Sequence, residues 1–153
     1  MVQADYLTAD DAEIREVADW MYGEWGFQNP NASHAKFAEK LRLRANKSEV
    51  PFSLVAKVDE LRVGAASVII SELPQFPQYS PWLAGVFVPP KWRSRGIANL
   101  LCKKADEIVR QLGYQEYFLF TYATEPYYLL RGWERIAEAN NLGTNGVIMR
   151  KKL

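Results

Sequence analysis

A cluster of basic residues and a glycine lies where the chain passes from an apolar stretch, residues 82–88, into a strongly periodic one. After two prolines the residues are Lys91-Trp92-Arg93-Ser94-Arg95-Gly96-Ile97-Ala98. If a helix begins at Ile97, the backbone N–H groups of its first turn have no intrahelical partner and carry partial positive charge. Gly96 and the small Ala98 leave room for a bulky anion to approach those groups. The pattern predicts a binding site for a phosphate-type anion.

The spacing argues against two other phosphate-binding motifs. The dinucleotide pattern G-x-G-x-x-G is absent, and no G-K-[ST] follows the glycine as a P-loop requires. Nicotinamide and nucleoside triphosphate ligands are therefore disfavoured. A second interpretation is a plain polar turn without a ligand, which is the commoner case for an arbitrary loop containing glycine. The flanking segments have to decide between the two.

Those segments predict a strand–helix–strand crossover around the turn. Residues 82–88 are typical of a central strand, which the two prolines that follow must end. The segment 117–122 is the parallel strand expected after a right-handed crossover. Between them, a helix over 97–112 presents one apolar face and ends at Gly113; the face consists of Ile97, Leu100, Leu101, Ala105, Ile108, Val109 and Leu112. Ligands bind outside the carboxyl ends of parallel strands, so chemistry is expected there.

The rest of the chain predicts strands at 2–7, 51–58, 61–71, 133–138 and 146–151, and helices from about Thr8, over about 32–45 and over about 125–131. Thr8 is the expected N-cap of the first helix. Leu73–Pro81 contains three prolines and is expected to be an irregular loop. This order predicts an α/β (α+β) domain with a mixed sheet of about seven strands, mostly antiparallel with one parallel pair, and about four flanking helices.

Charge and cysteine content limit the classes of function. The chain has 19 basic and 18 acidic residues and a net charge of +1, so no overall field attracts nucleic acid or an anionic membrane. A single cysteine and a single histidine exclude an internal disulfide and argue against a metal cluster. The start lacks signal-peptide features, and no apolar run approaches the ~20 residues of a membrane span. We expect one cytoplasmic domain over residues 1–153, without a metal.

The turn resembles the signature of the GNAT superfamily of N-acetyltransferases, [RQ]-x-x-G-x-[GA] after a strand ending in V-x-P. Here Arg93, Gly96 and Ala98 fill the pattern after Val88-Pro89. Further features follow in the family's order and extend the resemblance to nearly the whole chain. They are the opening strand and two helices, a strand at 117–121, the Y-x-x-x-G-[FW]-like segment 128–133, and the closing strand 147–153.

The resemblance implies acetyl-CoA as co-substrate. Its pyrophosphate would lie on the turn formed by Arg93, Ser94, Arg95, Gly96, Ile97 and Ala98. Its pantetheine amides would bond to backbone groups near Phe87 and Val88, where the two parallel strands part. In this family an amine attacks the thioester directly in a ternary complex, so no enzyme nucleophile is needed. The hydroxyl of Tyr128 is implied to protonate the departing sulfur; the alternative is that Tyr128 only packs its short helix.

The acceptor amine must lose a proton before it attacks, since alkylamines have pKa values of about 10. Glu24 and Glu72 are the candidates for that base, acting through water, although a solvated surface carboxylate is the commoner case for either. Cys102 is expected to be a structural thiol, and His34 a solvated surface residue. An aromatic acceptor pocket is a further hypothesis, with plain core packing as its alternative; its members are Trp25, Phe27, Trp82 and Tyr122.

The expected activity is transfer of an acetyl group to a primary amine of a small molecule or peptide. The sequence does not identify that amine, and it leaves the oligomeric state open, with a homodimer as one arrangement. Two other hypotheses stand beside the enzyme. One is a non-catalytic module that binds acyl-CoA and reports its level to a partner. The other is an interaction domain without any cofactor.

Overall fold

The computed structural model describes all residues 1–153, which form one seven-stranded sheet in the order β1-β2-β3-β4-β5-β7-β6. The strands are β1 (Val2–Tyr6), β2 (Phe52–Val58), β3 (Leu61–Ile69), β4 (Trp82–Phe87), β5 (Glu116–Thr121), β6 (Trp133–Asn141) and β7 (Thr144–Lys152). The helices are α1 (Asp11–Trp25), α2 (His34–Leu43), α3 (Ile97–Gln111) and α4 (Glu125–Leu129). Only β4 and β5 pair in parallel, as the sequence predicted. No helix is both long and apolar enough to cross a membrane.

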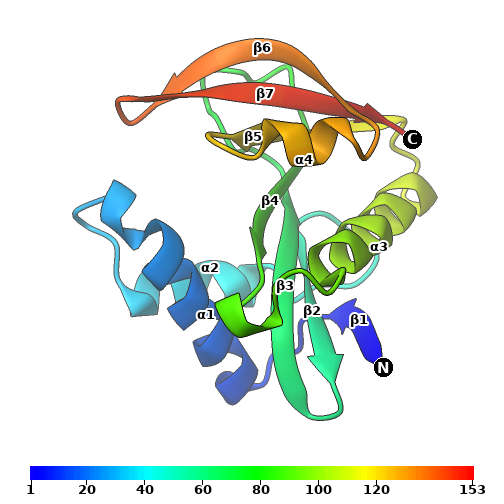
Figure 1. The fold of residues 1–153 in the computed structure, drawn as a ribbon. Coiled ribbons are helices and arrows are strands. Elements are labelled where there is room, and N and C mark those ends of the chain that lie inside the picture. The colour runs from blue at the N-terminus through cyan, green and yellow to red at the C-terminus, as the bar shows by residue number, and fades with distance from the viewer.

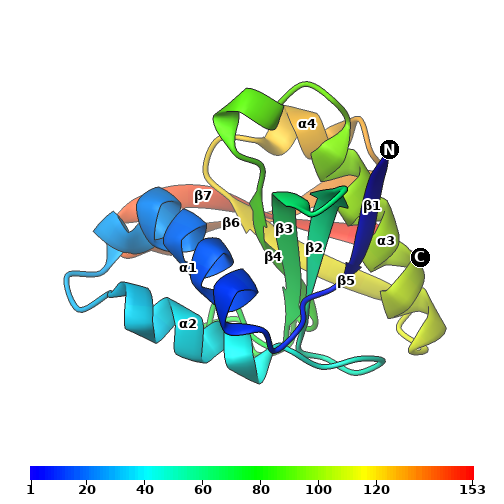
Figure 2. The same ribbon diagram turned by 90° about the horizontal axis from the view of Figure 1, so that it is seen from below.

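Helices cover both faces of the sheet (Figures 1 and 2). On one face α3 packs over β2 and β3, with Leu54 and Ala56 of β2 in its core. On the other face α1 and α2 lie together, and Val55, the residue between those two, belongs to their core. Successive residues of a strand point to opposite faces, so β2 is apolar on both sides and buried between two helical layers.

The parallel pair β4–β5 is short, and the sheet opens beyond it. Only Trp82 and Leu83 of β4 pair with β5. After them β4 carries one residue more than the paired segment of β3, and Gly85 at this bulge has φ +62°. A Cβ at Gly85 would also stand 2.9 Å from Cε of Met21. Bulges bend the strand that holds them, and no residue of β4 beyond Leu83 pairs with β5.

Two local predictions were wrong. Thr8 is not the N-cap of α1: the carboxylate of Asp10 accepts the amide hydrogen of Glu13 at 3.1 Å, while Thr8 itself bonds to the Glu13 side chain. The final strands are also longer than predicted, because the hairpin turn consists only of Leu142 and Gly143, at φ 53° and 86°. Asparagine-rich segments favour turns, but here cross-strand pairing extends the strands up to residues 141 and 144.

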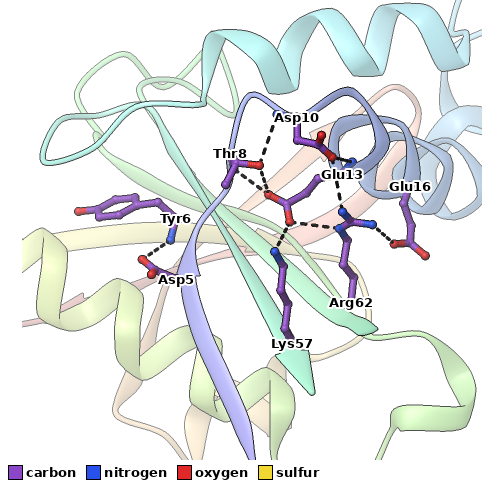
Figure 3. Close-up of polar contacts among 8 residues, drawn as sticks. All are labelled: Asp5, Tyr6, Thr8, Asp10, Glu13, Glu16, Lys57 and Arg62. Carbon is purple, nitrogen blue, oxygen red and sulfur yellow. Dashed lines mark hydrogen bonds and ion pairs between the residues drawn. The ribbon is translucent and has the colours of Figure 1, made fainter. Parts of the chain in front are cut away.

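The start of α1 is held by a buried carboxylate, Glu13, which is 1% exposed (Figure 3). Its oxygens accept hydrogen bonds from the amide and hydroxyl of Thr8 at 2.7 Å each and from Nε of Arg62 at 3.1 Å, and they pair with Nζ of Lys57 at 2.7 Å. Burial by itself raises the pKa of Glu13, but these donors outweigh burial and lower it to about 2. The cluster therefore ties the segment that follows β1 to α1, β2 and β3.

We predict that Glu13→Gln lowers the free energy of unfolding at pH 7 by about 2 to 3 kcal/mol, because it removes the buried charge that Lys57 and Arg62 neutralise. Since the folded-state pKa is depressed, the stabilisation is complete above the unfolded-state value of about 4.5 and disappears as pH falls toward 2. Urea unfolding across this pH range measures it. Glu16→Gln is the control, because Glu16 pairs with the same Arg62 but is 43% exposed. Equal losses in the two variants would contradict the prediction.

Candidate functional site

A cleft of about 1040 Å³ lies where β4 and β5 separate, and its walls come from α1, α2, β4, the start of α3, β5 and α4. Its lining is positively charged although the whole chain is nearly neutral. Five cationic side chains face only two carboxylates; the cations are Lys36, Lys40, Arg44, Arg93 and Arg131, and the carboxylates are Glu24 and Glu72. The cleft therefore favours anionic ligands.

The turn before α3 is shaped by its own side chains and by unusual backbone angles. Arg93 folds back so that its Nε donates to the carbonyl of Val88 at 2.9 Å, and its guanidinium lies 5.7 Å from the ring centre of Phe87. Ser94 and Gly96 both adopt positive φ, 62° and 77°. Gly96 is the N-cap of α3 and offers no side chain to the helix start. The N–H groups at the start of α3 therefore have no capping side chain and are free to donate hydrogen bonds to a group outside the chain.

Six consecutive amide groups at this turn have no partner. None of the N–H groups of residues 94–99 donates a hydrogen bond within the chain, and the first bond of α3 runs from Leu100 N to Gly96 O at 3.0 Å. A Cβ at Gly96 would meet nothing within 4 Å, so the space before the turn is open. Unpaired amides at the positive end of a helix that runs for 15 residues can bind an anion.

The structure brings nearly all of the predicted cofactor-binding residues into the cleft. Its lining includes Phe87, Val88, Arg93, Ser94, Gly96, Ile97 and Ala98. Arg95 is the exception, because its guanidinium stacks over the Trp92 ring at 4.8 Å, outside the lining. Since β5 pairs with β4 only as far as Leu83, the β5-facing backbone groups of the rest of β4 have no strand partner and border the cleft.

Tyr128 lines the cleft from α4 and is 9% exposed. Its ring packs edge-on against Tyr127 at 5.1 Å and Trp133 at 6.0 Å, while its hydroxyl forms no hydrogen bond to the protein. Burial raises the pKa of Tyr128, and Cys102 and Tyr127 raise it further against the opposing effect of Arg131. The hydroxyl is therefore protonated at neutral pH and is available as a donor.

Cys102 and His34 lie away from the centre of the cleft. Cys102 is a core residue beside Tyr128, and burial, followed by the nearby Asp106, raises its pKa to about 12. A thiol of this kind is not ionised at neutral pH and is a poor nucleophile. The His34 ring lies 4.1 Å from the Tyr22 ring at an angle of 34°, and its exposed side chain pairs with Asp19. No group of three His, Cys, Asp or Glu side chains is arranged to hold a metal ion.

The two carboxylates named from the sequence both line the cleft, in different environments. Glu24 is exposed near the end of α1. Glu72 follows β3 and is half-buried; burial raises its pKa, although Arg44 and Lys40 partly oppose that shift. A raised pKa makes a carboxylate a stronger base, so the structure distinguishes the two where the sequence did not.

Sequence reasoning missed the cations on this side of the cleft. Lys36, Lys40 and Arg44 are spaced four residues apart and line one side of α2 and the turn after it. Burial lowers the pKa of Arg44, and Glu72 raises it in part. The spacing of these cations was a usable signal, because residues four apart share a helix face. That this face borders the cleft could not be seen from the sequence.

The predicted aromatic pocket was half wrong. Trp25 and Tyr122 line the cleft, but Phe27 is 81% exposed outside it and Trp82 is completely buried. Trp82 packs on Phe118 at 6.0 Å, and its Nε1 donates to the carbonyl of Tyr79 at 2.7 Å. It therefore serves the core beneath the 70–81 loop. Composition alone does not show which face of a strand an aromatic side chain occupies.

Fold and site together define an α/β protein in which a turn with unpaired amides lies beside a split parallel strand pair. Residues 14–131 match the family described as the acetyltransferase (GNAT) family. This match covers most of the chain, so the protein belongs to the GNAT acetyltransferase family, and the resemblance noted in the sequence is confirmed. No curated protein matches the sequence.

Solved structures share the fold at low sequence identity. The GNAT acetyltransferase from Streptococcus pneumoniae has a TM-score of 0.74 and 12% identity, over 100% of this chain and 99% of that one. An aminoglycoside 6'-N-acetyltransferase complexed with coenzyme A has a TM-score of 0.74 and 15% identity, over 98% and 96%. N-acetylglutamate synthase from Neisseria gonorrhoeae, complexed with coenzyme A and N-acetyl-glutamate, has a TM-score of 0.74 and 15% identity; this chain spans 35% of that one.

Proposed function

We propose that the chain, as one domain over residues 1–153, transfers an acetyl group from acetyl-CoA to a primary amine by direct attack. The observation that carries this proposal is the set of unpaired amides at residues 94–99, which open on a positively charged cleft. Two relatives of the same fold were solved as complexes with coenzyme A, which supports the choice of anion.

The residues of the cleft fit coenzyme A. Its pyrophosphate would be held by amides of the turn 93–98, where Gly96 leaves the approach open. Its pantetheine arm would lie along β4 up to Phe87 and Val88, where backbone groups have no strand partner on the β5 side. When bound, the co-substrate supplies an activated acetyl thioester. The chain's own role is to orient this thioester toward the amine and to keep other nucleophiles away from it.

Proton transfers are assigned to two side chains of the cleft. Tyr128 holds a proton on an unpaired hydroxyl and donates it to the departing sulfur. Glu72 is favoured over Glu24 as the base that accepts the amine proton, because burial raises its pKa. Cys102 is not needed, and its raised pKa of about 12 is consistent with a structural role. A non-catalytic acyl-CoA-binding module would share the cofactor site but would not turn over.

The first prediction of this proposal concerns the turn. Gly96→Glu places a side chain and a negative charge before the unpaired amides and should abolish acetyl-CoA binding measured by calorimetry. Gly113→Glu is the matched control, because Gly113 also has positive φ and nothing within 4 Å of its Cβ position, but lies at the other end of α3. Acetyl-CoA affinity that survives in Gly96→Glu would refute the assignment of this turn.

The second prediction concerns the proton donor. Tyr128→Phe should lower kcat by about 10²-fold or more, because it removes only the hydroxyl, while acetyl-CoA affinity stays at the wild-type value. Thiol release and calorimetry measure the two effects. Tyr127→Phe, on the neighbouring residue of α4, should change kcat by no more than about 2-fold. An unchanged kcat in Tyr128→Phe would leave this tyrosine a packing residue only.

The third prediction concerns the base. The wild-type kcat should fall as pH decreases through the raised pKa of Glu72, because the protonated carboxyl cannot accept the amine proton. Glu72→Gln should have a lower kcat without this acidic limb in its pH profile. Glu24→Gln is the comparison: loss of the limb in that variant instead would assign the base to Glu24.

A further inference from the structure

The cations of α2 that line the cleft stand out because no carboxylate forms a salt bridge with them, although Nζ of Lys36 donates to the carbonyl of Asn31 at 2.7 Å. Arg42, on another side of α2, pairs with Asp11 at 3.7 Å. By contrast, Lys36, Lys40 and Arg44 line the cleft and take part in none of the salt bridges of the chain. Unpaired cations in a partly enclosed cleft are favourable when an anionic ligand occupies it.

Arg44 is held by one side-chain hydrogen bond and has further N–H donors without a partner. Its Nη1 donates to Oγ of Ser67 at 3.3 Å, and Ser67 in turn bonds to Oγ of Ser53 at 2.6 Å inside the sheet. Ser67 Oγ would lie 4.0 Å from a Cβ on Gly85, so this contact anchors Arg44 beneath the bulge of β4. A guanidinium carries five N–H donors in a planar fork, and no other side-chain hydrogen bond of Arg44 is formed. The remaining donors suit a carboxylate.

Glu72 lies in the same part of the cleft. It influences the pKa of Arg44 and is influenced by it, yet the two form neither a salt bridge nor a hydrogen bond. The two side chains thus present one positive and one negative group to the same cleft without a bond between them, and Arg44 keeps donors beyond the one bonded to Ser67. A molecule with an anionic group and an amine a few bonds apart complements this pair. The surroundings are partly apolar, with Met21, Trp25 and Phe37 in the lining.

We propose that the acceptor is an amino acid: a primary amine that carries a carboxylate, bound to Arg44 and Lys40, with the amine directed toward Glu72. This inference rests on the proposed acetyltransferase function and narrows its substrate class. Three cations against two carboxylates line this half of the cleft, which disfavours polycationic amines as acceptors. The apolar lining favours an apolar or aromatic side chain on the amino acid.

Matched acceptor pairs test the inference. L-phenylalanine is compared with 2-phenylethylamine, and L-leucine with 3-methylbutylamine, so that each pair differs only in the carboxylate. Thiol release from acetyl-CoA should give the amino acid a kcat/KM at least about 10-fold higher than that of its partner. Spermidine serves as the polycationic acceptor and should be poorer than either amino acid.

Variants of α2 then locate the carboxylate site. Arg44→Gln should reduce the preference within each pair to about 1, because the amino acid loses its bidentate partner. Lys40→Gln is a second variant at an exposed position, where folding is not at risk, and should reduce the preference by about 3-fold or more. Arg42→Gln is the control and should keep the wild-type preference. Thermal unfolding and acetyl-CoA calorimetry verify that each variant is folded.

The outcomes separate this inference from the proposed function. Absence of acetyl-CoA binding in the wild-type protein would overturn the proposed function and this inference with it. If acetyl-CoA binds but the amino acids are acetylated no faster than their partners, or spermidine is acetylated faster, only the amino-acid inference is overturned. A preference that persists in both Arg44→Gln and Lys40→Gln would overturn it as well.

Discussion

The whole site depends on the separation of β4 from β5. Two parallel pairs hold these strands together at Trp82 and Leu83, and then an extra residue at the Gly85 bulge bends β4 away. A Cβ at Gly85 would stand 2.9 Å from Cε of Met21, so both the positive φ and the lack of space favour glycine at the bulge. Because the ladder stops early, backbone groups of β4 border a cleft instead of a neighbouring strand. The same strand then delivers the chain to the start of α3.

Two clusters of cations show how differently a nearly neutral chain can use charge. Lys57 and Arg62 surround Glu13, whose pKa of about 2 shows how strongly the ionised carboxylate is stabilised. That cluster is complete and joins the first helix to the sheet. Lys40 and Arg44 line the cleft without any carboxylate bonded to them. Charges that are paired within the protein stabilise the fold. Charges in a cleft without such a partner favour binding of a ligand of opposite charge, and they therefore indicate function.

Much of the fold and the centre of the site followed from local signals. A face of apolar residues with a helical period defined α3, Gly113 ended it, and prolines ended β4. The turn at 93–98 could be recognised because its glycine, small residue and basic residues are consecutive in the chain. The strand and helix order then required one parallel pair, since a helical crossover connects strands that run in the same direction. Each of these inferences needed only residues that are close in sequence.

Local signals determined where the amides of an anion site would lie, and long-range packing decided what surrounds them. Arg44 and Glu72 are brought together only because the end of α2 and the end of β3 meet at the same wall of the cleft. Packing also buried Trp82 and left Phe27 in solvent. The physical reason is that a residue's type and its neighbours in the chain fix its backbone preferences, whereas its exposure, its partners and its pKa depend on segments far away in sequence.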